Sequence, residues 1–155
     1  MPQITKGGKY IFGWSVIKDD LSIQFPVKAI KEYSITSEGK VFIISGSKQT
    51  GGFVVSKKEL LYHSKIGNIL TDTPFLCDYK TEEGEFVKYK GRLYSWISIF
   101  DNGKIQLNQS MLETLDLEVG QKLLSIRSSD IAFCMGAKGQ LVERAENYQC
   151  EIEIF

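Results

Sequence analysis

The sequence predicts a mainly β protein with short helices, in which one structural unit occurs twice. Residues 14–47 correspond, without a gap, to residues 96–129, at an offset of 82 positions. Each copy begins with a stretch in which apolar residues alternate with their neighbours, at 10–16 and 93–99, which is typical of strands. Gly, Asn and Asp separate these stretches, where tight turns favour them. We therefore expect two similar halves, because an internal repeat of this kind determines the fold.

The two copies share identical residues and the spacing of apolar ones. The identical pairs include Trp14 and Trp96, Asp19 and Asp101, Ile23 and Ile105, Gln24 and Gln106, and Lys40 and Lys122. Apolar type is kept at Phe25 and Leu107, Ile30 and Leu112, Tyr33 and Leu115, Ile35 and Leu117, Val41 and Leu123, Phe42 and Leu124, and Ile44 and Ile126. A handful of identities can arise by chance, but this agreement in apolar spacing favours a repeat.

Each copy is predicted to contain a strand, a turn, a second strand, a helix and a third strand. Pro26 suits the first position of the first helix, and Asn108 suits the cap of the second. The Asn102-Gly103 pair tolerates the positive φ of a tight hairpin. The expected elements span 10–16, 18–20, 22–25, 26–33 and 41–45 in the first copy, and 93–99, 101–103, 104–107, 109–115 and 123–127 in the second.

The segments outside the two repeat copies are expected to add a helix and a final strand. Ser56 and Glu59 have capping-box spacing, which predicts a helix over Leu60 and Leu61. The alternating residues 150–155 predict a final strand. The chain is thus divided into a first repeat with its C-terminal helix at 1–67, a connector at 68–90 and a second repeat at 91–155.

The order of these elements resembles the AbrB/SpoVT-like swapped-hairpin domain. Its pattern is roughly Gly-Arg-Val-x-Ile-Pro, an apolar helix and Leu-x-x-Gly-Asp-x-Val. The matching stretches are 22–26, Ile35 and 39–41 in the first copy, and 103–108 and 117–123 in the second. In that family two chains interleave hairpins to make one dimeric barrel. The resemblance, which covers about half of the chain, therefore implies two AbrB-like halves that form an intramolecular pseudo-dimeric β-barrel.

Many members of that family resemble transcription regulators that bind DNA through basic residues. The resemblance therefore implies a non-enzymatic regulatory protein that contacts DNA or another polyanion. Residues 1–65 carry ten Lys and five Asp or Glu, a net charge of +5, whereas residues 66–155 carry a net −5. The candidate contacts lie in the basic half and are Lys6, Lys9, Lys28, Lys31, Lys40 and Lys48.

Several features of the charge pattern leave other interpretations open. Ser22 and Lys104 stand where the family has Arg, and a neutral chain with an acidic second half fits symmetric DNA binding poorly. The competing interpretation is that these lysines are simply solvated and bind no partner, as is common for runs of charge. The opposite charges also allow the halves to attract each other or a second chain, which would give a homo-oligomer.

A glycine-rich loop at 45–53 supplies the alternative function, that of a small-anion sensor or an interaction scaffold. Three glycines, the hydroxyls of Ser47 and Thr50 and a lysine can turn backbone N–H groups toward a phosphate or carboxylate. The candidate ligand-binding residues are Gly46, Ser47, Lys48, Thr50, Gly51 and Gly52. The loop lacks the Lys and Ser/Thr that a nucleotide P-loop requires after its last glycine. The competing interpretation is a hairpin whose glycines only provide positive φ.

The remaining candidates for chemistry are weak. His63 is the one histidine and has no nucleophile motif beside it, so we expect no enzyme. Cys77, Cys134 and Cys150 lack the close spacing of structural zinc ligands, so we expect no metal and no cofactor. The odd number of cysteines suits a reducing compartment, and no apolar run is long enough to cross a bilayer. A cytoplasmic protein without membrane contact is therefore expected.

Overall fold

The computed structural model describes residues 10–62, 68–148 and 152–155, and it confirms a mainly β protein with short helices. The first half contains β1 (Ile11–Val16), β2 (Ser22–Gln24), α1 (Val27–Tyr33), β3 (Lys40–Ser45), β4 (Phe53–Ser56) and α2 (Lys58–Tyr62). α3 (Asn68–Asp72), α4 (Pro74–Cys77) and β5 (Val87–Tyr89) follow. The second half contains β6 (Arg92–Ser98), β7 (Lys104–Gln106), α5 (Gln109–Leu115), β8 (Lys122–Arg127), β9 (Phe133–Gly136) and α6 (Gln140–Glu146).

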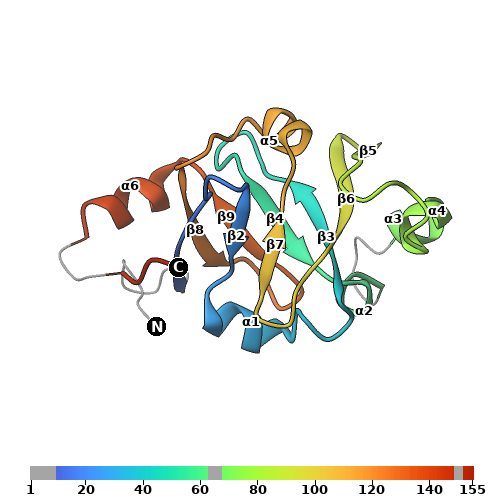
Figure 1. Ribbon diagram of the computed structural model, residues 1–155, viewed down its shortest axis with the longest axis horizontal. Helices are drawn as coiled ribbons and strands as arrows, with labels where there is room; N and C mark the ends of the chain where they lie inside the picture. Colours follow the sequence, from blue (N-terminus) through green and yellow to red (C-terminus); the bar gives the residue numbers. More distant parts are fainter. Residues whose placement is uncertain (1–9, 63–67, 149–151) are drawn as a thin grey trace.

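The strands form one large sheet and one small ribbon. The seven-stranded sheet has the order β1-β8-β9-β4-β3-β6-β5, and every pairing in it is antiparallel. β2 and β7 pair with each other in a separate two-stranded ribbon. The ribbon crosses one face of the sheet, and α1 and α5 lie near its two ends (Figure 1).

Each half of the chain pairs its strands with the other half. β1 pairs with β8, and the equivalent strand β6 pairs with β3. The registers are equivalent too, since Trp14 lies opposite Leu124 and Phe42 lies opposite Trp96. β2 pairs with its own counterpart β7, and β4 with β9, so an approximate two-fold axis passes between the members of each pair.

The expectation of a closed barrel was wrong. β1 and β5 lie at the two ends of the sheet, which stays open. Additional segments lie along the repeat strands β6 and β1. β5 pairs along β6, and the segment 152–155 runs along β1, where Trp14 N–H donates to the Glu153 carbonyl at 2.8 Å. Ile154 bridges Trp14 in the region where a final strand was expected.

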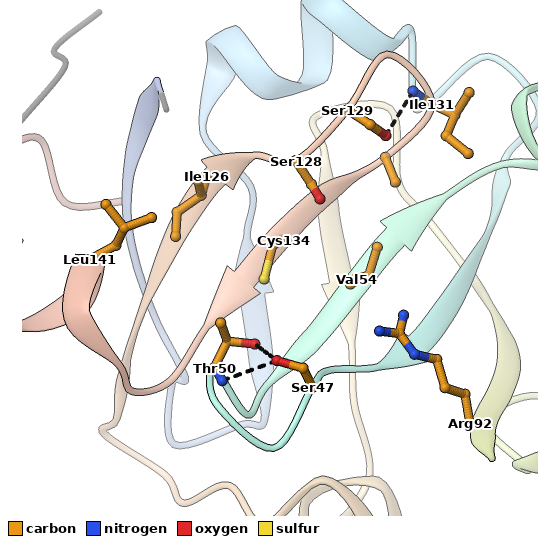
Figure 2. A pocket seen from close by; sticks show the side chains of 11 residues that line it. Ser47, Thr50, Val54, Arg92, Ile126, Ser128, Ser129, Ile131, Cys134 and Leu141 are labelled. Carbon is orange, nitrogen blue, oxygen red and sulfur yellow. Dashed lines mark hydrogen bonds between the residues drawn. The ribbon is translucent and has the colours of Figure 1, made fainter. Parts of the chain in front are cut away.

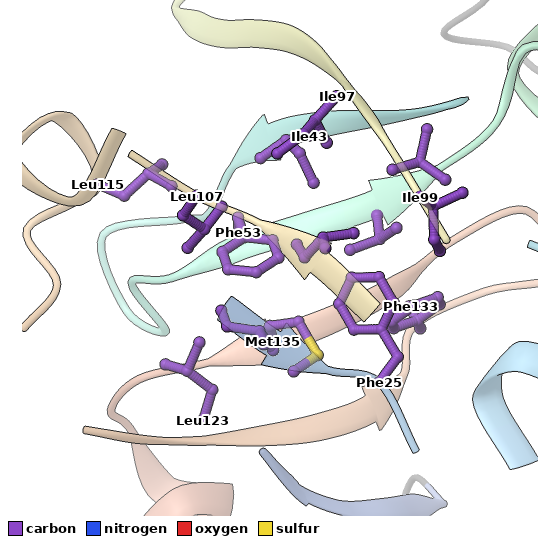
Figure 3. Packing of buried hydrophobic residues seen from close by; sticks show 14 of the residues in the cluster. Phe25, Ile43, Phe53, Ile97, Ile99, Leu107, Leu115, Leu123, Phe133 and Met135 are labelled. Atoms are coloured by element: carbon purple, nitrogen blue, oxygen red, sulfur yellow. The ribbon is translucent and has the colours of Figure 1, made fainter. Parts of the chain in front are cut away.

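The main core fills the space between the sheet and the β2–β7 ribbon. Phe25 and Leu107 from the ribbon region pack toward Phe53, Phe133 and Met135 of the central strands (Figure 3). The rings of Phe25 and Phe133 meet edge to face, with their centroids 5.2 Å apart, a favourable arrangement of aromatic quadrupoles. Alternate residues of the central strands thus face this core, as the period of two in a strand requires.

Helix ends follow the sequence signals in part. Asn108 caps α5, because its side-chain oxygen accepts a hydrogen bond from Met111 N–H at 2.8 Å. Pro26 precedes α1 instead of opening it. The capping box at Ser56 was wrong: this buried residue belongs to β4, and its hydroxyl donates to the Ile131 carbonyl at 2.7 Å. A helix nevertheless follows at α2. In the part of the chain that the structure describes, no helix is both long and apolar enough to span a bilayer.

Candidate ligand pocket

The face of the sheet opposite the main core carries two separate apolar clusters. Helix α6 covers one cluster, which includes Ile126 and Cys134. Helices α2, α3 and α4 cover the other, which includes Phe42 and Ile44. Val54 packs against both clusters and lies between them. The helices thus stand at the two sides of this face and leave the central strands β4 and β9 less covered (Figure 1).

A pocket of about 290 Å³ opens over these central strands. Its apolar lining consists of Val54, Ile126, Ile131, Ala132, Cys134 and Leu141. Its polar lining consists of Ser47, Thr50, Arg92, Ser128 and Ser129. Figure 2 shows Val54 and Cys134 side by side at the base, with Ser47 and Thr50 at one end and Ser128 and Ser129 at the other. An apolar base with a few polar groups at its rim is the usual composition of a small-molecule site.

The pocket lies across the approximate two-fold axis of the repeat. Val54 and Cys134 are opposite each other in the β4–β9 pair. Ser47 precedes β4, and Ser129, which lies 82 residues later, precedes β9. Both serines make a similar local bond: Ser47 Oγ accepts from Thr50 N–H at 3.3 Å, and Ser129 Oγ accepts from Ile131 N–H at 3.3 Å. The pocket is therefore built by both halves of the chain.

The glycine-rich loop contributes side chains to the pocket but uses part of its backbone internally. The N–H groups of Gly46 and Gly51 donate to Gly52 and Ser47 carbonyls, at 3.1 and 2.8 Å. The Thr50 hydroxyl lies 3.1 Å from that of Ser47. The Thr50 carbonyl accepts from the N–H groups of Ala137 and Lys138, at 2.9 and 3.0 Å. These bonds order the loop, and the Ser47 and Thr50 hydroxyls reach the pocket.

Two glycines of the loop are required by close backbone approach. A Cβ atom at Gly46 would lie 1.9 Å from the Gly51 carbonyl oxygen, and one at Gly52 would lie 1.9 Å from the Met135 carbonyl oxygen. Gly51 and Gly52 also have φ values of +60° and +61°. Glycine therefore makes this tight packing of the loop on β9 possible.

The rim of the pocket is cationic. Arg92 lines it from the start of β6, and Figure 2 shows its guanidinium directed toward Val54. A second pocket of about 560 Å³ adjoins it, shares Thr50, Ile126 and Leu141, and is lined also by Lys138. Among the residues that the structure describes, none that lines either pocket is acidic. Charge complementarity therefore favours an anionic ligand.

Asp130 is the acidic residue nearest in sequence to the pocket lining, and it forms an ion pair with Arg127. Asp130 follows Ser129, but its carboxylate accepts a hydrogen bond from Arg127 Nη2 at 2.5 Å. Arg127 Nε also contacts Glu32, at 3.2 Å, and these two carboxylates raise the pKa of the guanidinium. Arg127, Asp130 and Glu32 thus connect the β8–β9 loop to α1. The guanidinium that lines the pocket is that of Arg92.

The lysines proposed for DNA contact are distributed over different parts of the fold. Lys28 and Lys31 are exposed on α1, and Lys48 is exposed in the β3–β4 loop, at the opposite end of β3 (Figure 1). Lys40 Nζ lies over the rings of Tyr79 and Trp96, at 4.9 and 5.9 Å from their centroids. Lys6 and Lys9 lie outside the described residues. The candidate lysines among the described residues are therefore not gathered at one end of β3.

Sequence reasoning identified Ser47 and Thr50 but missed Arg92, Ser128, Ser129 and Cys134 as neighbours of that loop. Their proximity depends on strand order, which places β9 beside β4 and β6 beside β3. The serine at 129, identical to its repeat counterpart at 47, was an available signal. His63 and Cys150 lie outside the described residues, and within the described part no group of three His, Cys, Asp or Glu side chains is arranged to hold a metal ion.

Comparison with known proteins gives no relative, since no protein-family model matches this sequence and no curated protein matches it.

Proposed function

We propose that this protein is a non-enzymatic sensor that binds a small amphipathic anion in the pocket over β4 and β9. One observation carries the proposal: the base is apolar, the rim has Arg92 and several hydroxyls, and no described lining residue is acidic. An apolar body would lie on Val54 and Cys134, where burial of its surface contributes affinity. The carboxylate or phosphate would accept bonds from Arg92 and from the Ser47 or Thr50 hydroxyl.

We also propose that the two halves are AbrB-like swapped-hairpin units that form a pseudo-dimer within one chain. The reciprocal β1–β8 and β3–β6 pairings support this, because each half completes the sheet of the other. The left-handed helix caps at Ser34 and Asp116, again 82 residues apart, support it as well. In such a pseudo-dimer a ligand on the central axis contacts both halves, so its binding depends on how the two halves are paired.

The arrangement of charges favours this function over DNA or polyanion binding. Phosphate backbones are bound by several cations that share one surface. Here Lys28 and Lys31 are at one end of the sheet and Lys48 is at the other, while Lys40 contacts aromatic rings. Arg92, in contrast, stands beside hydroxyl groups and an apolar base. The DNA hypothesis stays a prediction from the sequence.

Thermal unfolding with a panel of anions tests the proposal. Octanoate, phenylacetate and octyl phosphate serve as amphipathic anions, and octanol and inorganic phosphate serve as the matched neutral and purely polar controls. Since a ligand that binds only the folded protein raises its melting temperature, at least one amphipathic anion should do so more than either control. Arg92→Gln should remove the shift.

Arg144→Gln is the matched control, because Arg144 is exposed on α6 and lines neither pocket. This variant should keep the full shift. Equal shifts in both variants, or no shift with any amphipathic anion in the unmodified protein, would refute the proposed site. A fluorescence titration with duplex DNA at low salt tests the other class, and tight, salt-sensitive binding there would favour the polyanion hypothesis.

A further inference from the structure

We infer that the ligand has two anionic groups joined by an apolar segment, an inference that rests on the proposed function. The second pocket adjoins the pocket over β4 and β9, since Thr50, Ile126 and Leu141 line both. Each pocket has one cationic residue, Arg92 in the first and Lys138 in the second. A molecule that extends through both would meet a positive charge in each.

Two apolar side chains and Thr50 lie where the two pockets adjoin. Ile126 is buried at the β8 side, and Leu141 extends from the first turn of α6. Thr50 is held at this point because its carbonyl accepts two hydrogen bonds from the start of the β9–α6 connection. A methylene chain or a flat apolar ring can bury its surface against Ile126 and Leu141.

The local packing fixes Lys138 near the glycine loop. Its N–H donates to the Thr50 carbonyl at 3.0 Å, and a Cβ atom built at Gly51 would lie 3.6 Å from its Cε. The stem of Lys138 thus lies along the loop, with Gln49, Thr50 and Gln140 as the other polar side chains of the second pocket. These residues supply hydrogen bonds around a second anionic group but add no negative charge.

The asymmetry of the two halves supports a ligand with a defined direction through the molecule. The position 82 residues before Arg92 is Tyr10, which is not cationic. Arg92 therefore marks one half of an otherwise approximately two-fold scaffold. A ligand with two anionic groups can reach Arg92 and Lys138 together, whereas a compact anion contacts one of them.

Isothermal titration calorimetry on the full chain tests the inference with linear α,ω-dicarboxylates of six to twelve carbons and the monocarboxylates of equal length. At the best length the dicarboxylate should bind about fivefold more tightly than its monocarboxylate, the gain expected from one additional exposed ion pair together with the twofold statistical advantage. Lys138→Gln should lower this ratio to about two, and Arg144→Gln should leave it unchanged. Arg92→Gln should weaken binding of both series.

The outcomes separate the inference from the proposed function. If monocarboxylates bind through Arg92 and the ratio stays at two or below at every length, the proposed function stands and the dianion is wrong. A ratio of about five that persists in Lys138→Gln also overturns the inference. If neither series binds, or if Arg92→Gln has no effect on either, the proposed function itself is wrong.

Discussion

The ammonium group of Lys122 lies 4.9 Å from the centroid of the Trp14 ring, and this contact joins the two halves of the chain. Its counterpart is Lys40, whose ammonium lies 5.9 Å from the centroid of the Trp96 ring. Lys40 and Lys122, like Trp14 and Trp96, are repeat equivalents. The cation of each half therefore stacks on the tryptophan of the other, which gives a physical reason for two of the identities in the repeat.

Removing the charge of Lys122 should destabilise the fold by about 0.5–1 kcal/mol, the range for a cation–π contact at an exposed site. Lys122→Met keeps much of the aliphatic stem and removes the ammonium. Urea unfolding monitored by tryptophan fluorescence measures the change. Lys28→Met on α1 is the control and should change stability by less than half as much. Equal effects of the two variants would contradict a specific role for the Trp14 contact.

A second reciprocal contact links the hairpin turns. Gln24 Nε2 donates to the Asn102 carbonyl at 2.7 Å, and its equivalent Gln106 donates to the Asp20 carbonyl. Gln24→Met and Gln106→Met should therefore cost similar amounts, roughly 1 kcal/mol each, because each removes one cross-half bond. Denaturant unfolding of both variants and of Gln109→Met, on the exposed start of α5, checks this. A loss in only one of the two would break the proposed equivalence.

Replacing Gly52 and Gly39 by alanine distinguishes two requirements for glycine, a positive φ and close contact with a neighbouring backbone. Gly52 and Gly39 have similar positive φ values, +61° and +69°, but only the former would place a Cβ against a neighbour, the Met135 carbonyl. Gly39→Ala should cost roughly 1 kcal/mol from backbone strain. Gly52→Ala should cost at least about 2 kcal/mol more, since the loop must move off β9. Comparable unfolding free energies for the two variants would show that the loop does not pack closely there.

Tyr79 makes the fold sensitive to high pH. Burial raises the pKa of its hydroxyl to about 12, and the buried oxygen has no hydrogen-bond partner among the described residues. Below pH 10 the phenol is neutral in both states, so its contribution is fully present. As the pH rises from 10 to 12 the unfolded chain ionises first, and stability is lost.

Tyr79→Phe tests this contribution, because phenylalanine cannot ionise and can keep the stacking on Phe42, whose ring centroid is 5.6 Å away. At pH 7 the variant should be as stable as the unmodified protein or slightly more so. At pH 11 the unfolding free energy of the variant should exceed that of the unmodified protein by roughly 1 kcal/mol. Equilibrium unfolding at both values of pH provides the measurement, and a constant difference between them would contradict the buried phenol.

The repeat made much of the fold predictable, because each copy carries its own local signals. The Asn108 cap and the Asn102-Gly103 turn act over a few residues, and the structure shows the cap as expected. The open sheet was not predictable in the same way. It depends on β5 and on residues 152–155, which lie beyond the repeated segment and cover the edges of β6 and β1.

The pocket was predictable only at its glycine loop. Ser47 and Thr50 are close in sequence and belong to a recognisable loop, whereas Arg92 and Cys134 reach the same place through pairing of distant strands. Ser56 shows the converse error. Its spacing to Glu59 suggested a helix cap, but burial in β4 and the bond to Ile131 take precedence over that local signal.

The most direct measurement for the pocket is a two-dimensional amide NMR titration of the full chain with an amphipathic anion such as octanoate. The largest chemical-shift changes should occur at Ser47, Thr50, Ser128 and Cys134, around the pocket over β4 and β9. Arg92→Gln should reduce these changes at the same ligand concentration. Changes centred instead on Lys28 and Lys31 of α1, or an unaltered spectrum at millimolar ligand, would contradict the account.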